Sequence, residues 1–234
     1  RQSEALCFQG DRLIVANEQR DVFVIDHFLP DPPPALLPEL GEVELPVCAA
    51  RPGAACDCPD VESGAVIPLR NAGAGEQLRW CLAGDLLCMS GRLHIRPGAE
   101  PLVVGSTADE GGLGSALLLG FGGEERTLIA PQDMVLAIGV DAAGRATVAR
   151  VDLTADPIPI LSFAAQISGG VQGNALSFDL AVSTEAIWQT TSPDRWRLDV
   201  QGYRLKEGRE VRFSGPDHYA MWRPYVWGRV TVRR

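Results

Sequence analysis

The chain has 234 residues, of which 46% are hydrophobic and 22% charged, a balance typical of a soluble globular protein with one large domain or two small ones. Its 21 basic and 30 acidic residues give a net charge of −9. A chain of this charge repels phosphate backbones, which excludes nucleic acid as the main ligand. No run of about 18 apolar residues occurs, so we expect no membrane span.

Two β-branched runs near the N-terminus predict a β-hairpin. Residues 13–16 read Leu-Ile-Val-Ala, residues 22–25 read Val-Phe-Val-Ile, and a polar segment separates them. Prolines follow at positions 30, 32, 33, 34, 38 and 46. Proline lacks a backbone donor and favours extended geometry, so we expect a stiff arm rather than a sheet strand. The sequence therefore predicts an N-terminal unit of hairpin and arm over residues 1–45.

This order of hairpin and extended stretch resembles segments of large secreted bacterial adhesins. The pattern runs from Gly10 through Val22–Phe28 to the prolines, and Asn17–Asp21 stands where those segments have an Asp-Gly turn. The resemblance covers about 30 residues. It rests on hydrophobic residues and turns alone, so it implies no chemistry.

Five of the six cysteines lie between residues 48 and 88, among many prolines and glycines. Because these turn-forming residues interrupt every apolar run, packing alone holds the region weakly, and cross-links would stabilise it. We expect up to three disulfides and an oxidising compartment. The candidates are Cys7, Cys48, Cys56, Cys58, Cys81 and Cys88.

The connectivity of the cysteines stays open at this point, because six cysteines can pair in many ways. One prediction is a disulfide between Cys81 and Cys88, which bracket a predicted turn. Cys56 and Cys58 have poor geometry for bonding to each other, so they require separate partners, for example Cys48 and one member of the Cys81/Cys88 pair.

The rival interpretation of the cysteines is a metal centre, with zinc or an iron–sulfur cluster held by thiolates. Structural zinc sites usually contain two Cys-x2–4-Cys knuckles, and the cysteine spacings here match that pattern poorly. We therefore predict no metal and no cofactor, and keep the metal-cluster protein as an alternative. Its ligands would be Cys48, Cys56, Cys58 and Cys88.

From residue 134 onward, hydrophobic and polar residues alternate, which is typical of strands with one buried face. Residues 134–140 and 146–151 flank Gly144 and predict a hairpin. The alternation recurs at 176–182, 196–201 and 226–233. No convincing amphipathic helix of about ten residues or more is present. The chain is therefore predicted to be all-β.

The main part of the chain, residues 46–234, is predicted to be a β-sandwich-like domain that is stabilised by disulfides in its cysteine-rich loop region. Its glycine-rich segment, 111–123, has neither a G-x-S-x-G motif nor a phosphate-loop motif. We interpret this segment as a flexible loop or a β-bulge. A further boundary is placed near residues 105–130.

Aromatic residues gather in the last fifth of the chain, interleaved with arginines. Aromatic residues on strands most often pack in cores, but such a set can also form a flat platform for a sugar or a partner protein. The candidate platform consists of Trp222, Tyr225, Trp227 and Arg229.

These features favour a non-enzymatic structural or binding module that is secreted, exposed at the cell surface, or periplasmic. Its expected role is adhesion or assembly, for example as a subunit of a filament, fibre or phage-like particle. The expected partner is another protein subunit, including a second copy, or a surface polysaccharide. The enzymatic alternative is a secreted hydrolase of polysaccharides or esters with Asp217 or His218 near the tryptophans, although no residue is assigned as catalytic.

Overall fold

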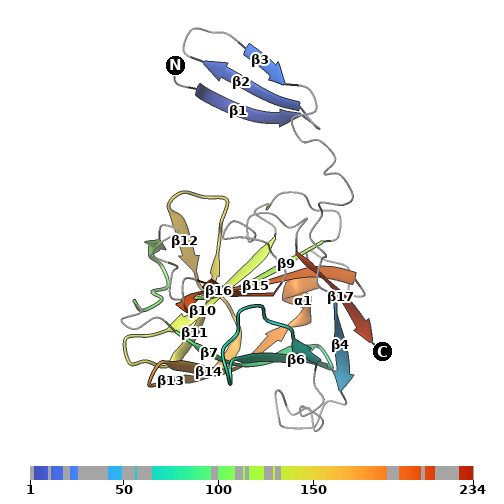
Figure 1. The fold of residues 1–234 in the computed structure, drawn as a ribbon, viewed down its shortest axis with the longest axis vertical. Coiled ribbons are helices and arrows are strands. Elements are labelled where there is room, and N and C mark those ends of the chain that lie inside the picture. The colour runs from blue at the N-terminus through green and yellow to red at the C-terminus, as the bar shows by residue number, and fades with distance from the viewer. Residues whose placement is uncertain are drawn as a thin grey trace. The chain divides into compact units, whose positions relative to one another are not determined.

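The computed structural model divides the chain into two compact units, residues 1–39 and 40–234 (Figure 1). The residues that it describes are 3–9, 12–17, 22–25, 42–48, 56, 65–95, 100–108, 113, 116–123, 129, 133–188, 195–206, 209–213 and 227–233. Apart from one short helix, the regular secondary structure of these residues consists of β-strands. Among them, no helix has the length and apolar character needed to cross a membrane.

The N-terminal unit contains a three-stranded antiparallel sheet. Its strands are β1 (Ser3–Gln9), β2 (Arg12–Asn17) and β3 (Val22–Ile25), in the order β1-β2-β3. Leu13 pairs with Ile25, so the predicted hairpin is confirmed. The sequence did not reveal β1, because its residues lack a clear β-branched run. The prolines at 30–38 lie outside the described residues.

The main unit contains one sheet of 14 strands. They are β4 (Glu42–Cys48), β5 (Ala65–Ile67), β6 (Gln77–Ala83), β7 (Leu86–His94), β8 (Thr107–Ala108), β9 (Leu117–Gly122), β10 (Met134–Val140), β11 (Ala146–Val151), β12 (Ile158–Leu161), β13 (Gln166–Gln172), β14 (Ala175–Ser183), β15 (Arg195–Lys206), β16 (Arg209–Arg212) and β17 (Gly228–Arg233). The helix α1 (Thr184–Trp188) follows β14. The hairpin predicted from 134–151 is β10 and β11.

This sheet folds back on itself into two packed halves. The first sheet half has the order β13-β14-β7-β6, and the second contains β17-β15-β9-β10-β11-β12. Strand β4 joins the halves, because it pairs in parallel with both β6 and β17. At the opposite side, Arg145 bridges to Gly170 and brings the hairpin of β10 and β11 against β13.

The main core lies between the two sheet halves. Trp80 of β6 meets Trp196 of β15 with ring centroids 5.5 Å apart, and Phe121 of β9 lies 5.6 Å from the same Trp196 ring. The two sheet halves thus pack face to face, which confirms the predicted all-β, sandwich-like fold.

A second core covers the outer face of the second sheet half. It contains Leu118 of β9, Val135 of β10 and Trp227, while Leu117 and Leu119 of β9 face the main core. Strand β9 is therefore buried on both faces. The interpretation of this glycine-rich segment as a flexible loop or bulge is wrong for residues 117–122, because two cores enclose it.

The division into units differs from the predicted one by a few residues. The boundary falls after Glu39 rather than near residue 45, because β4 begins at Glu42 and pairs with the main sheet. Pro46 lies within β4, opposite Arg233. The segment at 42–48 is thus a sheet strand and not an arm. Residues 40–234 form one compact unit, without the further boundary predicted near 105–130.

Candidate binding site

The outer face of the first sheet half carries the polar side chains of three neighbouring strands. Along β6, Leu78 and Trp80 are buried in the main core, so the alternating residues Gln77 and Arg79 face outward. The same alternation turns Ser90 and Arg92 of β7 outward, together with Ser177 and Asp179 of β14. Sheet geometry thus gathers polar residues from segments far apart in the sequence.

Strand register arranges these residues in rows across the sheet. In the first row, Gln77 pairs with Arg92 and Arg92 with Ser177. In the second row, Arg79 pairs with Ser90 and Ser90 with Asp179. A third row follows in which Cys81 pairs with Cys88 and Cys88 with Ala181. Directly opposite side chains in such rows have Cβ atoms about 4.5–5.5 Å apart, close enough to share one ligand.

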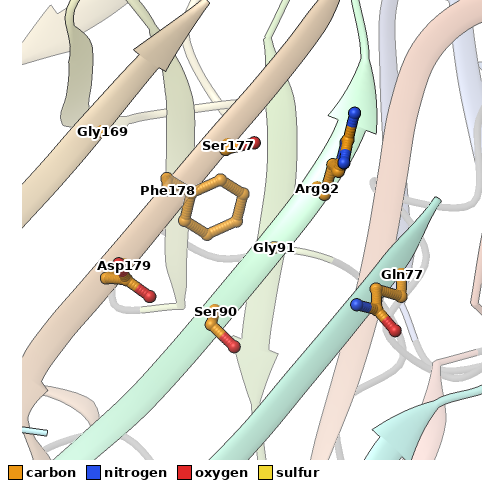
Figure 2. A pocket seen from close by; sticks show the side chains of 8 residues that line it. All are labelled: Gln77, Ser90, Gly91, Arg92, Gly169, Ser177, Phe178 and Asp179. Atoms are coloured by element: carbon orange, nitrogen blue, oxygen red, sulfur yellow. The ribbon is translucent and has the colours of Figure 1, made fainter. Parts of the chain in front are cut away.

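The first two rows enclose a hollow of about 260 Å³, which we call the larger hollow. Figure 2 shows its side chains on neighbouring strands of the first sheet half. It is lined by Gln77, Ser90, Gly91, Arg92, Gly169, Ser177, Phe178 and Asp179. The volume lies just below the range of about 300–1,000 Å³ for small-molecule pockets, which suits one compact unit of a ligand.

The larger hollow contains two opposite charges that are not paired with each other. Arg92 and Asp179 are both exposed, and neither has a hydrogen bond or ion pair to another described residue. Their cross-strand neighbours Gln77, Ser177 and Ser90 are uncharged. The two charges lie on a diagonal of the ladder, where neighbours are about 7–8 Å apart. Both groups are therefore available to a ligand.

Gly91 and Phe178 lie between the two rows. They pair directly with each other, and a Cβ added to Gly91 would lie 2.5 Å from Cε1 and Cζ of Phe178. Glycine is therefore required for the buried Phe178 ring to cover β7 at this point. Gly169, opposite Phe178 on β13, has φ +114°. A Cβ there would lie 2.1 Å from the Ser177 carbonyl oxygen.

A buried carboxylate fixes the strand ends next to the first row. The Glu76 side chain is 1% exposed, and its Oε1 accepts the His94 backbone N–H at 2.9 Å. The same oxygen lies 2.9 Å from His94 Nδ1, and Oε2 accepts the Gly73 N–H. Because Glu76 precedes Gln77 and His94 follows Arg92 by two residues, this contact holds both members of the row in place. His94 is the last residue of β7.

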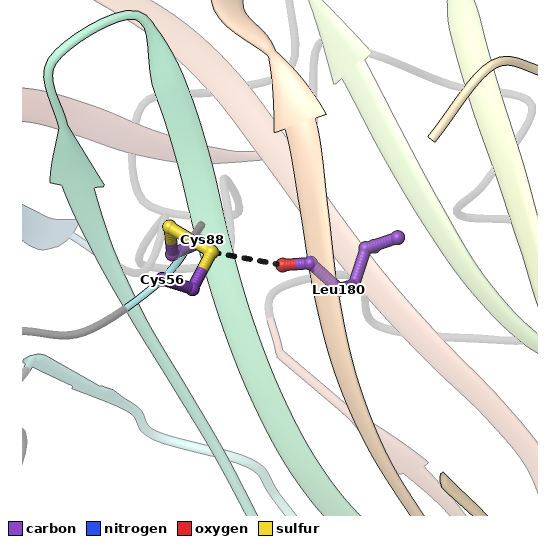
Figure 3. Close-up of a disulfide and its surroundings, with 3 residues drawn as sticks. All are labelled: Cys56, Cys88 and Leu180. Carbon is purple, nitrogen blue, oxygen red and sulfur yellow. Dashed lines mark hydrogen bonds between the residues drawn. A yellow bond between two sulfur atoms is a disulfide. The ribbon is translucent and has the colours of Figure 1, made fainter. Parts of the chain in front are cut away.

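A disulfide between Cys56 and Cys88 closes the face beyond the second row, with a Cα–Cα distance of 5.5 Å. Figure 3 shows it beside β14, where Cys56 Sγ lies 3.8 Å from the Leu180 carbonyl oxygen. A disulfide sulfur has no proton to donate, so this is a packing contact. The sulfur atoms thus reach across from β7 to the backbone of β14, next to Asp179.

This disulfide forms one wall of a second hollow, of about 90 Å³, which we call the smaller hollow. It shares Ser90 and Asp179 with the larger hollow. Its lining consists of Cys56, Arg79, Trp80, Cys81, Cys88, Met89, Ser90 and Asp179. The second row is therefore the common border of the two hollows.

The structure corrects two predictions about the cysteines. Cys81 and Cys88 are cross-strand neighbours, but they do not bond to each other, because Cys88 is bonded to Cys56. Cys81 is held in a disulfide as well. A metal centre that uses Cys56 and Cys88 is also wrong, because disulfide sulfurs are not thiolates.

The remaining cysteines are described only in part. Cys48 ends β4 and packs half-buried beside Cys81 and Cys88. Only the backbone of Cys7 is described, in β1, and Cys58 lies outside the described residues. The described residues contain no group of three or more potential metal ligands.

The predicted aromatic platform is wrong at Trp227, which is 0% exposed in the second core. The Trp227 ring lies in the core that covers the outer face of the second sheet half, so it is not available at the surface. Arg229 is exposed, with Nη1 3.9 Å from Glu42 Oε1. Trp222 and Tyr225, as well as Asp217 and His218 of the hydrolase alternative, lie outside the described residues.

Comparisons with known proteins give distant matches only. No family model matches the chain, and no curated protein matches it. Among solved structures, a carbohydrate-binding module of family 9 from Caldicellulosiruptor kristjanssonii matches in complexes with cellotriose and with glucose, each at a TM-score of 0.48 and 10% identity. These matches cover 81% of this chain and 93% and 95% of the module chains.

A candidate carbohydrate-binding protein from Bacteroides uniformis also matches, at a TM-score of 0.48 and 12% identity, over 81% of this chain and 99% of that one. Likeness at this level carries no functional assignment. The function is therefore argued from the residues of the two hollows.

Proposed function

We propose that the main unit is a non-enzymatic binding module and that a surface polysaccharide binds in the larger hollow. The lining of the hollow supports this: Arg92 and Asp179, without partners among the described residues, stand beside the hydroxyls of Ser90 and Ser177 and the amide of Gln77. Sugar hydroxyls both donate and accept hydrogen bonds. Neighbouring hydroxyls of one ring therefore match a guanidinium, which only donates, next to a carboxylate, which only accepts.

The rigidity of the site supports binding without a costly rearrangement. Every polar lining residue projects from a strand, and the contact of Glu76 with His94 fixes the ends of β6 and β7. Groups that are already in place lose little conformational entropy when a ligand arrives. A sugar, which makes many individually weak hydrogen bonds, depends on this property.

Charge and lining together favour a neutral polysaccharide that is bound rather than cleaved. The net charge of −9 opposes the approach of an acidic polymer. Glycosidases generally use two carboxyl groups on either side of the scissile bond. The described lining of both hollows contains a single carboxylate, that of Asp179.

The disulfide supports a location in an oxidising compartment, where such bonds persist. A secreted or surface-exposed module would meet polysaccharides there. Adhesion and self-assembly remain predictions from the sequence.

Affinity electrophoresis through gels that contain soluble neutral polysaccharides tests this proposal, together with pull-down on insoluble ones. The wild-type protein should be retarded by at least one polymer, and Arg92→Ala should weaken binding about tenfold or more, since charge-assisted hydrogen bonds are lost. Arg70→Ala is the matched control, because Arg70 is an exposed arginine that lines neither hollow. The proposal fails if no polysaccharide binds, or if both variants bind as the wild type does.

A further inference from the structure

The size and the lining of the smaller hollow indicate which substituent the preferred sugar carries. Its volume of about 90 Å³ is about a third of the 260 Å³ of the larger hollow. It therefore suits a substituent of a few heavy atoms rather than a second sugar ring. Because it adjoins the larger hollow at Ser90 and Asp179, a ring in the larger hollow can extend a substituent into it.

Ser90 and Asp179 match the two polar sides of an amide. They are direct cross-strand neighbours on β7 and β14, with both side chains on the outer face of the sheet. The Asp179 carboxylate accepts hydrogen bonds, whereas the Ser90 hydroxyl can donate one. A secondary amide carries its N–H and its C=O on opposite sides, so one amide between these residues would donate to Asp179 and accept from Ser90.

The wall beyond this pair is suited to a methyl group. Cys56 and Cys88 present their disulfide there, with Cys56 Sγ packed against the Leu180 carbonyl oxygen. Disulfide sulfur is polarizable and offers no proton, so it contacts an apolar group favourably and competes little for hydrogen bonds. In an N-acetyl substituent, the methyl group lies just beyond the amide.

We propose that the smaller hollow binds the N-acetyl group of an amino sugar, so that the module prefers polysaccharides built from N-acetylhexosamine. Asp179 accepts the amide N–H, Ser90 donates to the carbonyl oxygen, and the Cys56–Cys88 disulfide contacts the methyl group. This inference rests on the proposed function, because the sugar ring must occupy the larger hollow.

Two matched ligands test the preference. Triacetylchitotriose and cellotriose have the same β-1,4-linked backbone and differ only in the acetamido group, so the ratio of their dissociation constants in titration calorimetry isolates that group. The full chain should bind triacetylchitotriose about tenfold or more tightly. Saturation-transfer NMR should show the strongest transfer to the acetyl methyl protons.

Two serine variants distinguish the contribution of the smaller hollow to binding from that of the larger hollow. Ser90→Ala should lower the preference about fivefold, since it removes one hydrogen bond to the amide. Ser177→Ala is the matched control, because Ser177 lines only the larger hollow, and it should weaken both ligands without changing their ratio. Both positions are on the outer face of the sheet, and thermal unfolding should verify that both variants fold.

The outcomes distinguish the two proposals. If cellotriose or another sugar without an acetamido group binds as tightly as triacetylchitotriose, the N-acetyl inference is overturned while the binding module stands. An unchanged ratio in Ser90→Ala also overturns it. If no polysaccharide binds, both proposals fail.

Discussion

Asp179 on β14 and Asp199 on β15 occupy comparable outward positions on the two sheet halves, yet Asp179 is exposed and Asp199 is only 1% exposed. Leu180 beside the first and Leu198 beside the second point into the same main core. The difference comes from what lies outside each sheet half. The second half is covered by a second core, whereas the described part of the first carries the two hollows.

This difference shows that alternation identifies which residues face away from a core, but not whether they reach solvent. Gln201 follows the pattern of Asp199 and is also 1% exposed. Buried polar groups require internal partners, so those on the second half contribute to stability. The exposed Arg92 and Asp179 of the first half do not have that role and can serve a ligand.

The largest expected effect comes from breaking the contact between the sheet halves. Trp196→Ala should lower the free energy of unfolding by about 3–5 kcal/mol, because the ring packs against both Trp80 and Phe121 and leaves a cavity when removed. Urea unfolding followed by circular dichroism measures this loss. Val66→Ala, at a position that is 49% exposed, is the control and should change stability by less than about 0.5 kcal/mol. Equal losses in the two variants would contradict the packing described here.

An effect of intermediate size on stability is expected when the two aspartates are each replaced by alanine. Asp199→Ala should cost about 2 kcal/mol, since the carboxylate is buried and its interaction within the protein is lost. Asp179→Ala should change stability by less than about 0.5 kcal/mol while it weakens ligand binding. Chemical denaturation of both variants measures the difference. If Asp179→Ala is the more destabilising change, the conclusion that polar residues are buried on the outer face of the second sheet half but exposed on that of the first is contradicted.

The smallest effect concerns the turn that closes the two sheet halves against each other. In this turn, the carbonyl oxygen of Gly144 accepts the backbone N–H of Val171 in β13 at 2.9 Å. Asp141 in the same turn accepts hydrogen bonds from Arg145. The backbone N–H of Arg145, and after it the guanidinium, hold the pKa of Asp141 below its usual value of 3.8. A folded-state pKa below the unfolded value stabilises the fold above about pH 4. This contribution is lost as the pH falls through the folded-state pKa.

Asp141→Asn should therefore unfold more readily than the wild type near pH 6, and the difference should shrink towards pH 3. Urea midpoints across this pH range measure the difference. Arg145→Gln should reproduce part of the effect, because it removes the guanidinium partner of the same pair but keeps the backbone N–H that lowers the pKa of Asp141 most. A constant difference at all pH values would contradict the assigned cause.

Strands of the main unit with one polar face, such as β14, could be predicted from sequence, because Phe178, Leu180 and their polar neighbours alternate regularly. The site could not be predicted. Gln77, Arg92 and Ser177 meet only through strand register, and no local pattern states which strands are neighbours. The burial of Trp227 depends in the same way on the second core, which is assembled from separate segments.

Strand β4 gives the unit a particular order of assembly. Val43 of β4 pairs with Val230 of β17, so the first and last described strands of the main unit lie side by side. During synthesis, β4 is made long before β17, so the edge of β4 that pairs with β17 stays unpaired until the end of the unit has been made. Contacts this distant in sequence slow folding and prolong the exposure of that edge to other chains. Loss of β17 alone would therefore leave the junction between the two sheet halves incomplete.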